Sequence, residues 1–244
     1  MALLDLNSDR RAPVALALDA PNLGIATAWA VAAAPYLAAI KIGLESYLRD
    51  GASGVRSVWA GVEASGAARP ALFLDLKLHD IPNTVAGAAR SVADLAPDFL
   101  TVHALGGPEM IAAAAEALPE TRIVAVTVLT SMDQDTMAAV GIGGEPTEAA
   151  VRLARMAVQA GARALVCSPL EVAAVREAVP AETVLITPGV RPTGSAAGDQ
   201  RRIATPEQAW ADGADLLVIG RPITGSGDVA AACQEILELS IGNR

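Results

Sequence analysis

Short apolar runs alternate with longer amphipathic or alanine-rich segments along the whole chain. The runs have the length of strands, and the segments between them have the length of helices. We expect strands over 13–19, 36–43, 71–78, 98–104, 122–130, 164–168, 183–189 and 215–221. We expect helices over 22–34, 44–67, 83–96, 107–118, 146–160, 169–178, 205–212 and 226–239.

Alternating strands and helices predict right-handed βαβ units and a parallel sheet. Nearly continuous apolar strands are typical of a sheet that is covered on both faces. Eight such units in 244 residues predict an α/β fold, a closed (β/α)8 TIM barrel formed as a single domain by residues 1–244. An open doubly wound sheet is the alternative, but no Gly-x-Gly-x-x-Gly fingerprint follows the first run.

Composition narrows the classes of partner. The hydrophobic fraction is 52% but the aromatic fraction only 3%, so Leu, Val, Ile and Ala must fill the core. A net charge of −9 argues against nucleic acid, which needs a basic face. The two cysteines have no metal-ligand spacing and provide no disulfide framework, and Cys167 lies in an apolar run typical of the core.

Residues 25–40 are nearly uncharged, which raises the question of a membrane span. The segment is mostly Ala, contains Pro35 and is shorter than the roughly 20 residues that a span needs. A helix followed by a strand explains it better. The charged N-terminus lacks the apolar run of a signal peptide, so we expect a cytoplasmic protein with no membrane partner.

The run 71–78 carries charges in its second half. Strand alternation places Leu72, Leu74, Leu76 and Leu78 on one face, and Ala71, Phe73, Asp75 and Lys77 on the other. Asp80 follows the strand, and Lys41 lies near the end of another. A buried ion pair of structural value is the alternative, but such pairs seldom improve on apolar packing. Neighbouring carboxylates would keep Lys77 protonated, and such a lysine can protonate a developing carbanion.

Two glycine-containing stretches, 187–202 and 218–224, follow the seventh and eighth predicted strands. Barrels frequently bind phosphate there. Gly220 and Arg221 lie between a strand and a helical segment, where free N–H groups favour an anion. The alternative is that these stretches are ordinary loops with solvated arginines. The charged residues of strand 71–78, taken together with these stretches, favour phosphate binding over that alternative.

Other polar residues at strand ends are weaker candidates. Thr130 and Ser131 could hydrogen-bond the amide edge of a heterocycle, although Thr-Ser is also a common helix N-cap. Asp19 could bind sugar hydroxyls or cap a loop. His79 and His103 have no nucleophile motif beside them, and we expect structural roles for both. The spacing of His and Cys residues indicates no metal site. Asp75 and Asp80 could hold Mg²⁺, but Lys77 between them disfavours a cation.

Seven stretches between Val14 and Thr224 occur, in chain order, as KIGLE, DLKLHDIPNT, TVHALGG, VLTSM, PGVRP, GDQRR and VIGRPIT. Their combination closely resembles the orotidine 5′-phosphate decarboxylase family. The resemblance implies that Lys77 protonates C6 of the pyrimidine. It also implies that Asp75 faces the departing carboxylate, and that Asp80 and Lys41 complete a charged network.

The same resemblance assigns the other substrate contacts. Asp19 and Lys41 would bind the ribose, and Ser131, with Thr130 beside it, the pyrimidine amide. The 5′-phosphate side would be formed by Gln200, Gly220, Arg221 and, in the same loop, Arg191.

The implied reaction converts orotidine 5′-monophosphate to UMP without a cofactor or metal. Asp80 and Thr84 would reach into the neighbouring subunit's site, so a homodimer is implied. Two alternatives stay open: a metal-dependent phosphosugar decarboxylase or epimerase of the same barrel group, and a non-catalytic phosphate-binding barrel.

Overall fold

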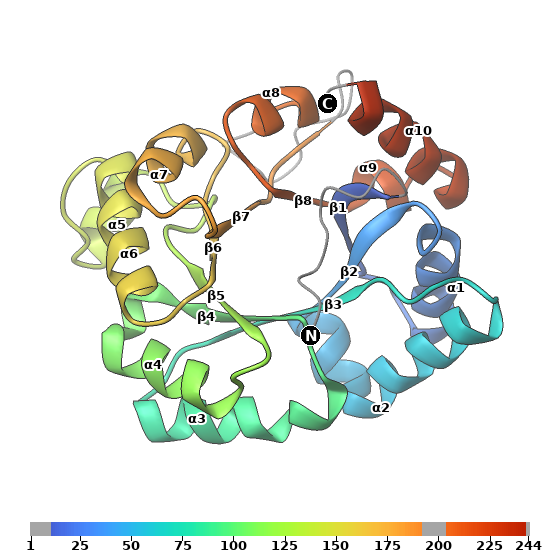
Figure 1. The fold of residues 1–244 in the computed structure, drawn as a ribbon, viewed down its shortest axis with the longest axis horizontal. Coiled ribbons are helices and arrows are strands. Elements are labelled where there is room, and N and C mark those ends of the chain that lie inside the picture. The colour runs from blue at the N-terminus through green and yellow to red at the C-terminus, as the bar shows by residue number, and fades with distance from the viewer. Residues whose placement is uncertain (1–10, 192–203, 243–244) are drawn as a thin grey trace.

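Eight parallel strands form a closed barrel in the computed structural model, which describes residues 11–191 and 204–242 (Figure 1). Each strand pairs with the next along the chain, and the last pairs with the first. The strands are β1 (Ala12–Ala17), β2 (Leu37–Gly43), β3 (Ala71–Leu78), β4 (Phe99–His103), β5 (Arg122–Val126), β6 (Ala164–Val166), β7 (Val184–Thr187) and β8 (Leu216–Ile219). The expected α/β barrel is therefore confirmed, and the open sheet is excluded.

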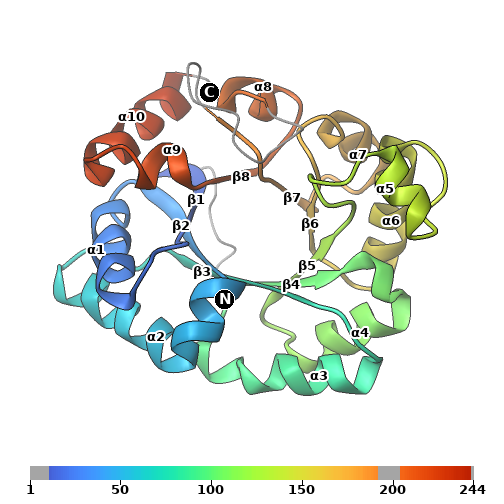
Figure 2. The same ribbon diagram turned by 180° about the vertical axis from the view of Figure 1, so that it is seen from behind.

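Helices surround the barrel on its outside, as both views of the ribbon show (Figure 2). They are α1 (Leu23–Ala33), α2 (Leu44–Ala64), α3 (Pro82–Ser91), α4 (Pro108–Ala117), α5 (Gln134–Ala139), α6 (Pro146–Gln159), α7 (Val172–Ala178), α8 (Pro206–Ala211), α9 (Arg221–Thr224) and α10 (Val229–Gly242), with 3₁₀ turns at Ala93–Leu95 and Ala104–Gly106. Among the described residues, no helix combines the length and apolar character that a membrane span requires. Residues 25–40 form parts of α1 and β2, as the sequence predicts.

The interior of the barrel contains both phenylalanines of the chain. The ring centroids of Phe73 and Phe99 lie 5.6 Å apart, and small or branched residues such as Ala15, Ala164 and Ile186 surround them. Two large rings among small side chains can therefore fill the interior without further aromatic residues.

A second core lies between the strands and the helices. Leu72 and Leu74 of β3 belong to it, whereas Phe73 points into the barrel, so the alternation expected for this strand is confirmed. On α1, Ala26 and Ala30 are buried against the sheet. Small helix residues let the helices approach the strands closely, which explains how a chain so poor in aromatic residues fills its core.

The structure differs from the expected elements at three places. The helix expected over 44–67 is interrupted at Gly51, whose backbone (φ 61°, ψ −163°) lies in a region almost restricted to glycine. The strand expected over 122–130 ends at Val126. The short helices α5 and α9 were not expected. Residues 128–130 line a pocket and are not part of a strand. A hydrophobicity pattern cannot distinguish a pocket-lining segment from a buried strand.

Candidate active site

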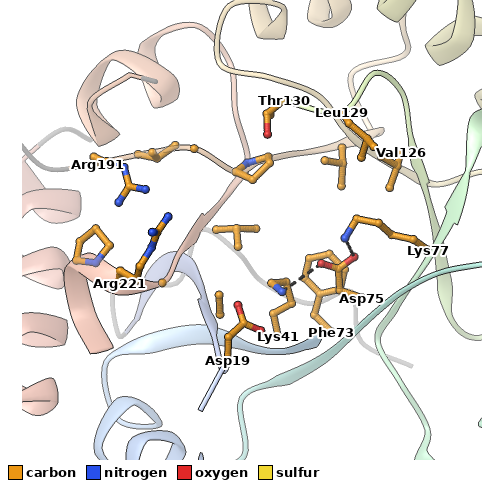
Figure 3. A pocket seen from close by; sticks show the side chains of 18 of the residues that line it. Asp19, Lys41, Phe73, Asp75, Lys77, Val126, Leu129, Thr130, Arg191 and Arg221 are labelled. Carbon is orange, nitrogen blue, oxygen red and sulfur yellow. Dashed lines mark hydrogen bonds and ion pairs between the residues drawn. The ribbon is translucent and has the colours of Figure 1, made fainter. Parts of the chain in front are cut away.

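A cavity of about 430 Å³ opens at the carboxyl ends of the strands. Residues from β1, β2, β3, β5, β6, β7 and β8, or from the segments that follow them, line its walls. This end of the barrel carries the chemistry in characterised enzymes of this fold. Polar groups gather at two places in the cavity, one around Asp75 and one around Arg221 (Figure 3).

Asp75 lies between two lysines at the first of these places. Its Oδ1 atom is 2.7 Å from Nζ of Lys77, and its Oδ2 atom is 3.1 Å from Nζ of Lys41 (Figure 3). The side chains of Asp75 and Lys41 are 12% and 10% exposed, whereas that of Lys77 is 31% exposed. The expected grouping of these three charges is confirmed, with Lys77 the more accessible of the two cations.

The environment of Asp75 shifts its acidity in two opposing directions. Burial raises the pKa of the Asp75 carboxyl, but the charges of Lys41 and Lys77 and their hydrogen bonds outweigh burial, so that the pKa lies below its ordinary value. The carboxylate is therefore ionised at neutral pH, and its negative charge is fixed between two ammonium groups.

The two lysines in this group are the only lysines in the chain; every other Lys or Arg position is arginine. An ammonium is a compact charge that can release a proton, whereas a guanidinium does not lose its proton in proteins. The uneven use of the two basic residue types is a signal in the sequence that motif-based reasoning did not use.

Thr101 joins this group from β4, and sequence reasoning missed it. Its hydroxyl lies 3.1 Å from Oδ1 of Asp75 and accepts a 2.8 Å hydrogen bond from the backbone N–H of Lys77. Thr101 is fully buried. The signal available was strand alternation, because Thr101 shares the barrel face of Phe99, on which a polar residue is unusual.

Asp19 and Lys41 lie close together above Gly43. A Cβ atom at Gly43 would come within 3.1 Å of Oδ1 of Asp19 and 3.2 Å of Nζ of Lys41. A larger residue at this position would push both polar groups away, so glycine preserves the space that they share. Both side chains line the cavity, as expected for a pair that binds the ribose.

Arg191 and Arg221 lie at the other side of the cavity, away from Asp75 and Lys77 (Figure 3). Burial, followed by the charge of Arg221, lowers the pKa of Arg191. Gly220 immediately precedes α9 and packs tightly, since a Cβ there would lie 3.3 Å from the Cβ of Ala17. Two guanidinium groups brought to one place favour an anionic ligand.

Three predicted residues are not brought to this cavity in the single chain. Thr130 lines the cavity, but the neighbouring Ser131 is exposed and does not. Asp80 and Thr84, whose expected place in the neighbouring subunit's site stays a prediction, are exposed outside the cavity. The reason is local: β3 ends at Leu78, and Asp80 accepts a 2.6 Å hydrogen bond from the backbone of Ile81 as the chain turns toward α3. Gln200 lies outside the described residues.

His79 and His103 pack against each other with ring centroids 5.5 Å apart. Burial, followed by the electrostatic influence of the neighbouring His79 and Lys77, lowers the pKa of His103. Neither histidine lines the cavity, and their expected structural roles stay a prediction.

The described residues offer neither a metal site nor a reactive thiol at Cys167. Within residues 11–191 and 204–242, no three His, Cys, Asp or Glu side chains are grouped to hold a metal ion. Cys167 is buried, as expected, and burial followed by the charge of Glu171 raises its pKa to about 12. Such a thiol is not a nucleophile at neutral pH.

Known proteins resemble this chain over most of its length. The sequence pattern of the orotidine 5′-phosphate decarboxylase / HUMPS family matches residues 12–236. The orotidine 5′-phosphate decarboxylase of Thermobifida fusca (strain YX) is 62% identical over 221 residues, which cover 91% of this chain and 92% of that protein. The protein of the same name from Frankia casuarinae is 52% identical over 237 residues, covering 93% of this chain and 86% of that protein.

Solved structures give the same result. The crystal structure of orotidine 5′-phosphate decarboxylase from Lactobacillus acidophilus superposes with a TM-score of 0.78 at 33% identity, covering 93% of this chain and 97% of that chain. The enzyme from Pyrococcus horikoshii OT3, at 22% identity and a TM-score of 0.76, shares the fold and covers 94% of this chain and 99% of that one. On these matches, the chain belongs to the orotidine 5′-phosphate decarboxylase / HUMPS family.

Proposed function

We propose that this chain, as a single-domain cytoplasmic enzyme, decarboxylates orotidine 5′-monophosphate to UMP in pyrimidine biosynthesis. Its family and the names of its relatives support the reaction. The observation that carries the proposal is the position of Asp75 between two ammonium groups, with two guanidinium groups elsewhere in the same cavity. A nucleotide has its anionic phosphate at one end and the reacting base at the other, and this arrangement of charges suits both ends.

The substrate orientation follows from the charges. The phosphate binds at Arg191, Gly220 and Arg221, and the ribose hydroxyls lie between it and the lysines, against Asp19 and Lys41. The carboxylate of the base then faces Asp75, with C6 beside Nζ of Lys77. Thr130 lies at the cavity wall for the pyrimidine amide; Ser131 joins it if segment 131–146 moves inward on binding. Gln200 remains assigned by resemblance to the phosphate.

The chemistry breaks one carbon–carbon bond and forms one carbon–hydrogen bond. The bond between C6 and the carboxylate breaks, CO₂ leaves, and the electron pair stays on C6 in an sp² orbital that the ring cannot delocalise well. Lys77 then gives one proton to C6, and its neutral amine regains a proton from solvent after product release. The proposal needs no electron acceptor, because no oxidation or reduction of a second molecule occurs.

Two electrostatic effects compete as the source of acceleration. Repulsion between Asp75 and a substrate carboxylate at about 4 Å is worth roughly 4 kcal/mol at an effective dielectric constant near 20. The upper range of enzymatic acceleration requires about 20 kcal/mol or more. Repulsion is therefore too small by itself. The larger contribution comes from the ammonium of Lys77, which Asp75 holds in place before the reaction and which faces the negative charge as it develops.

The site is completed by a second subunit in this proposal. Asp80 and Thr84 are exposed in the single chain, and Ile81 between them is 67% exposed. A homodimer would cover Ile81 and carry Asp80 and Thr84 toward the neighbouring cavity.

Mixing two inactive variants tests the shared site. Lys77→Ala and Asp80→Ala homodimers should both be inactive. After the subunits are mixed and exchanged at random, about a quarter of the sites should contain both wild-type side chains and regain activity. Mixtures that stay inactive, although co-purification of two differently tagged subunits shows hybrid dimers, would exclude the shared site.

The reaction itself is tested by following the absorbance of orotidine 5′-monophosphate during incubation with the wild-type chain, with and without EDTA. Turnover that resists EDTA supports the proposal. Turnover that requires a divalent metal would favour the phosphosugar alternative, and nucleotide binding without turnover would favour a non-catalytic barrel.

A further inference from the structure

The pairing between β3 and β4 is irregular at the catalytic end of β3. Phe73 pairs with Phe99 and Leu74 with Leu100, but the next paired residues are Leu78 and Val102. Over this interval β3 advances four residues while β4 advances two, so β3 forms a bulge that contains Asp75, Leu76 and Lys77. Thr101 is the residue of β4 that lies opposite the bulge.

The bulge places Lys77 in a backbone conformation that is unfavourable for lysine. Its φ angle is +48°, in the left-handed region, and Ala96 is the one other non-glycine residue with a positive φ among those that the structure describes. This conformation brings the Cβ atom too close to the following carbonyl oxygen. It persists only where surrounding contacts hold it.

The hydroxyl of Thr101 provides two such contacts at once. It accepts the backbone N–H of Lys77 at 2.8 Å and lies 3.1 Å from Oδ1 of Asp75, to which it donates its proton. A hydroxyl has one proton and two lone pairs, so both bonds can form together. The same Oδ1 atom receives Nζ of Lys77 at 2.7 Å, while Oδ2 receives Lys41.

These contacts connect the backbone of Lys77 to the other end of its own side chain. The N–H of Lys77 binds Thr101, Thr101 binds Asp75, and Asp75 binds Nζ of Lys77. A change at any one of these bonds alters where the ammonium points. An ordinary buried threonine that satisfies a single carbonyl has no such connection to a reacting group.

We propose that Thr101 is a positioning residue for decarboxylation, whose hydroxyl holds the left-handed bulge at Lys77 and fixes the carboxylate plane of Asp75. Thr101 does not touch the substrate; it acts through the two charged side chains that do. The proposal rests on the proposed function for its kinetic consequence, but its geometric consequence can be measured without turnover.

The test compares three variants. Thr101→Val removes the hydroxyl and keeps the shape of the side chain, and Thr101→Ser keeps the hydroxyl. Thr121→Val is the matched control, because Thr121 is also buried and donates one 2.8 Å hydrogen bond to the carbonyl of Pro97. Thr121 immediately precedes the first residue of β5, at the end of the barrel away from the cavity. If Thr101→Val shows no cooperative thermal unfolding transition, and so does not fold, Thr101→Ala is used in its place.

We expect Thr101→Val to lower kcat by about ten- to a hundredfold, the effect of leaving buried polar groups unpaired beside the reacting centre. KM should change by less than about threefold, because the phosphate and ribose contacts are untouched. Thr101→Ser should recover kcat to within about threefold of wild type. Thr121→Val should lose thermal stability but keep both constants.

Crystal structures of the same variants give the independent measurement. In Thr101→Val, Lys77 should leave the left-handed region, or its Nζ should move beyond about 3.5 Å from Oδ1 of Asp75. The proposal is overturned if that variant keeps wild-type kcat, if Thr101→Ser loses as much as Thr101→Val, or if the geometry at residue 77 is unchanged. If the wild-type chain does not decarboxylate the substrate, the proposed function fails, and the crystal structures alone decide the role of Thr101.

Discussion

Replacing Lys77 with alanine removes the group on which the proposed reaction depends most. Asp75 would keep Lys41 at 3.1 Å, so one cation still neutralises the carboxylate and the cavity need not collapse. The lost ammonium lies 2.7 Å from Oδ1 of Asp75 and is the more exposed of the two, so it is the one able to face a bound base. The substitution therefore separates catalysis from the integrity of the site.

The size of the effect can be worked from this geometry. An ammonium that protonates C6 approaches it to a hydrogen-bond distance of about 3 Å, and at an effective dielectric constant of about 20 this attraction is worth about 5 kcal/mol. That amount corresponds to roughly 10³- to 10⁴-fold in kcat. Loss of the proton donor slows the second step as well, so Lys77→Ala should lose at least about 10³-fold.

The assay follows the absorbance of orotidine 5′-monophosphate at saturating concentration, and calorimetry measures the affinity for UMP. UMP affinity should fall by less than about tenfold, because phosphate and ribose contacts remain. Arg155→Ala, which removes an exposed cation on α6, should behave like wild type in both measurements. A Lys77→Ala variant that folds, binds UMP and keeps more than about a tenth of wild-type kcat would refute the assignment of Lys77.

Three further predictions concern other parts of the chain. Arg221→Ala should lower kcat/KM by about 10²- to 10³-fold and should also lower kcat, because phosphate binding drives closure of segment 131–146; a raised KM with unchanged kcat would contradict closure. The interactions that lower the pKa of Asp75 stabilise the fold at pH values above the pKa of the unfolded chain, which is near 4. This stabilisation is lost as the pH falls through the lower pKa of the folded protein. Urea unfolding should therefore find the stability difference between wild type and Asp75→Asn smaller at pH 3 than at pH 6; a constant difference would contradict the shift. Gly51→Ala should lower the free energy of unfolding by about 1–2 kcal/mol through backbone strain, since no atom lies within 4 Å of the added Cβ. The control Gly87→Ala, within α3 and without a positive φ, should not destabilise, and equal effects would exclude strain as the cause.

The sequence predicted the architecture because strand and helix periods are local properties. Eight apolar runs separated by alanine-rich segments gave all eight barrel strands, most of them within two or three residues of their observed ends. Where prediction failed, the cause was a choice that periodicity does not record. Val128 and Leu129 extend an apolar run but line the cavity, and the glycine conformation that interrupts α2 has no signature in hydrophobicity.

The sequence also predicted much of the candidate site, because the carboxyl ends of parallel strands meet at one end of a barrel. Asp19, Lys41, Asp75, Lys77 and Arg221 reach the cavity from four different strands or the segments after them. Asp80 and Ser131 do not, although each lies within a few residues of one that does. Proximity in sequence beyond the end of a strand says little about direction, because the chain turns there.

By itself, the sequence determined which chemical groups stand at the strand ends, since alternation and chain order fix the face and the end of each side chain. Only the tertiary structure decided how those groups engage one another. The bulge in β3, the left-handed backbone of Lys77 and the bonds of Thr101 depend on the register between two neighbouring strands. That register is set by hydrogen bonds and packing between segments distant along the chain, which no local pattern of residues records.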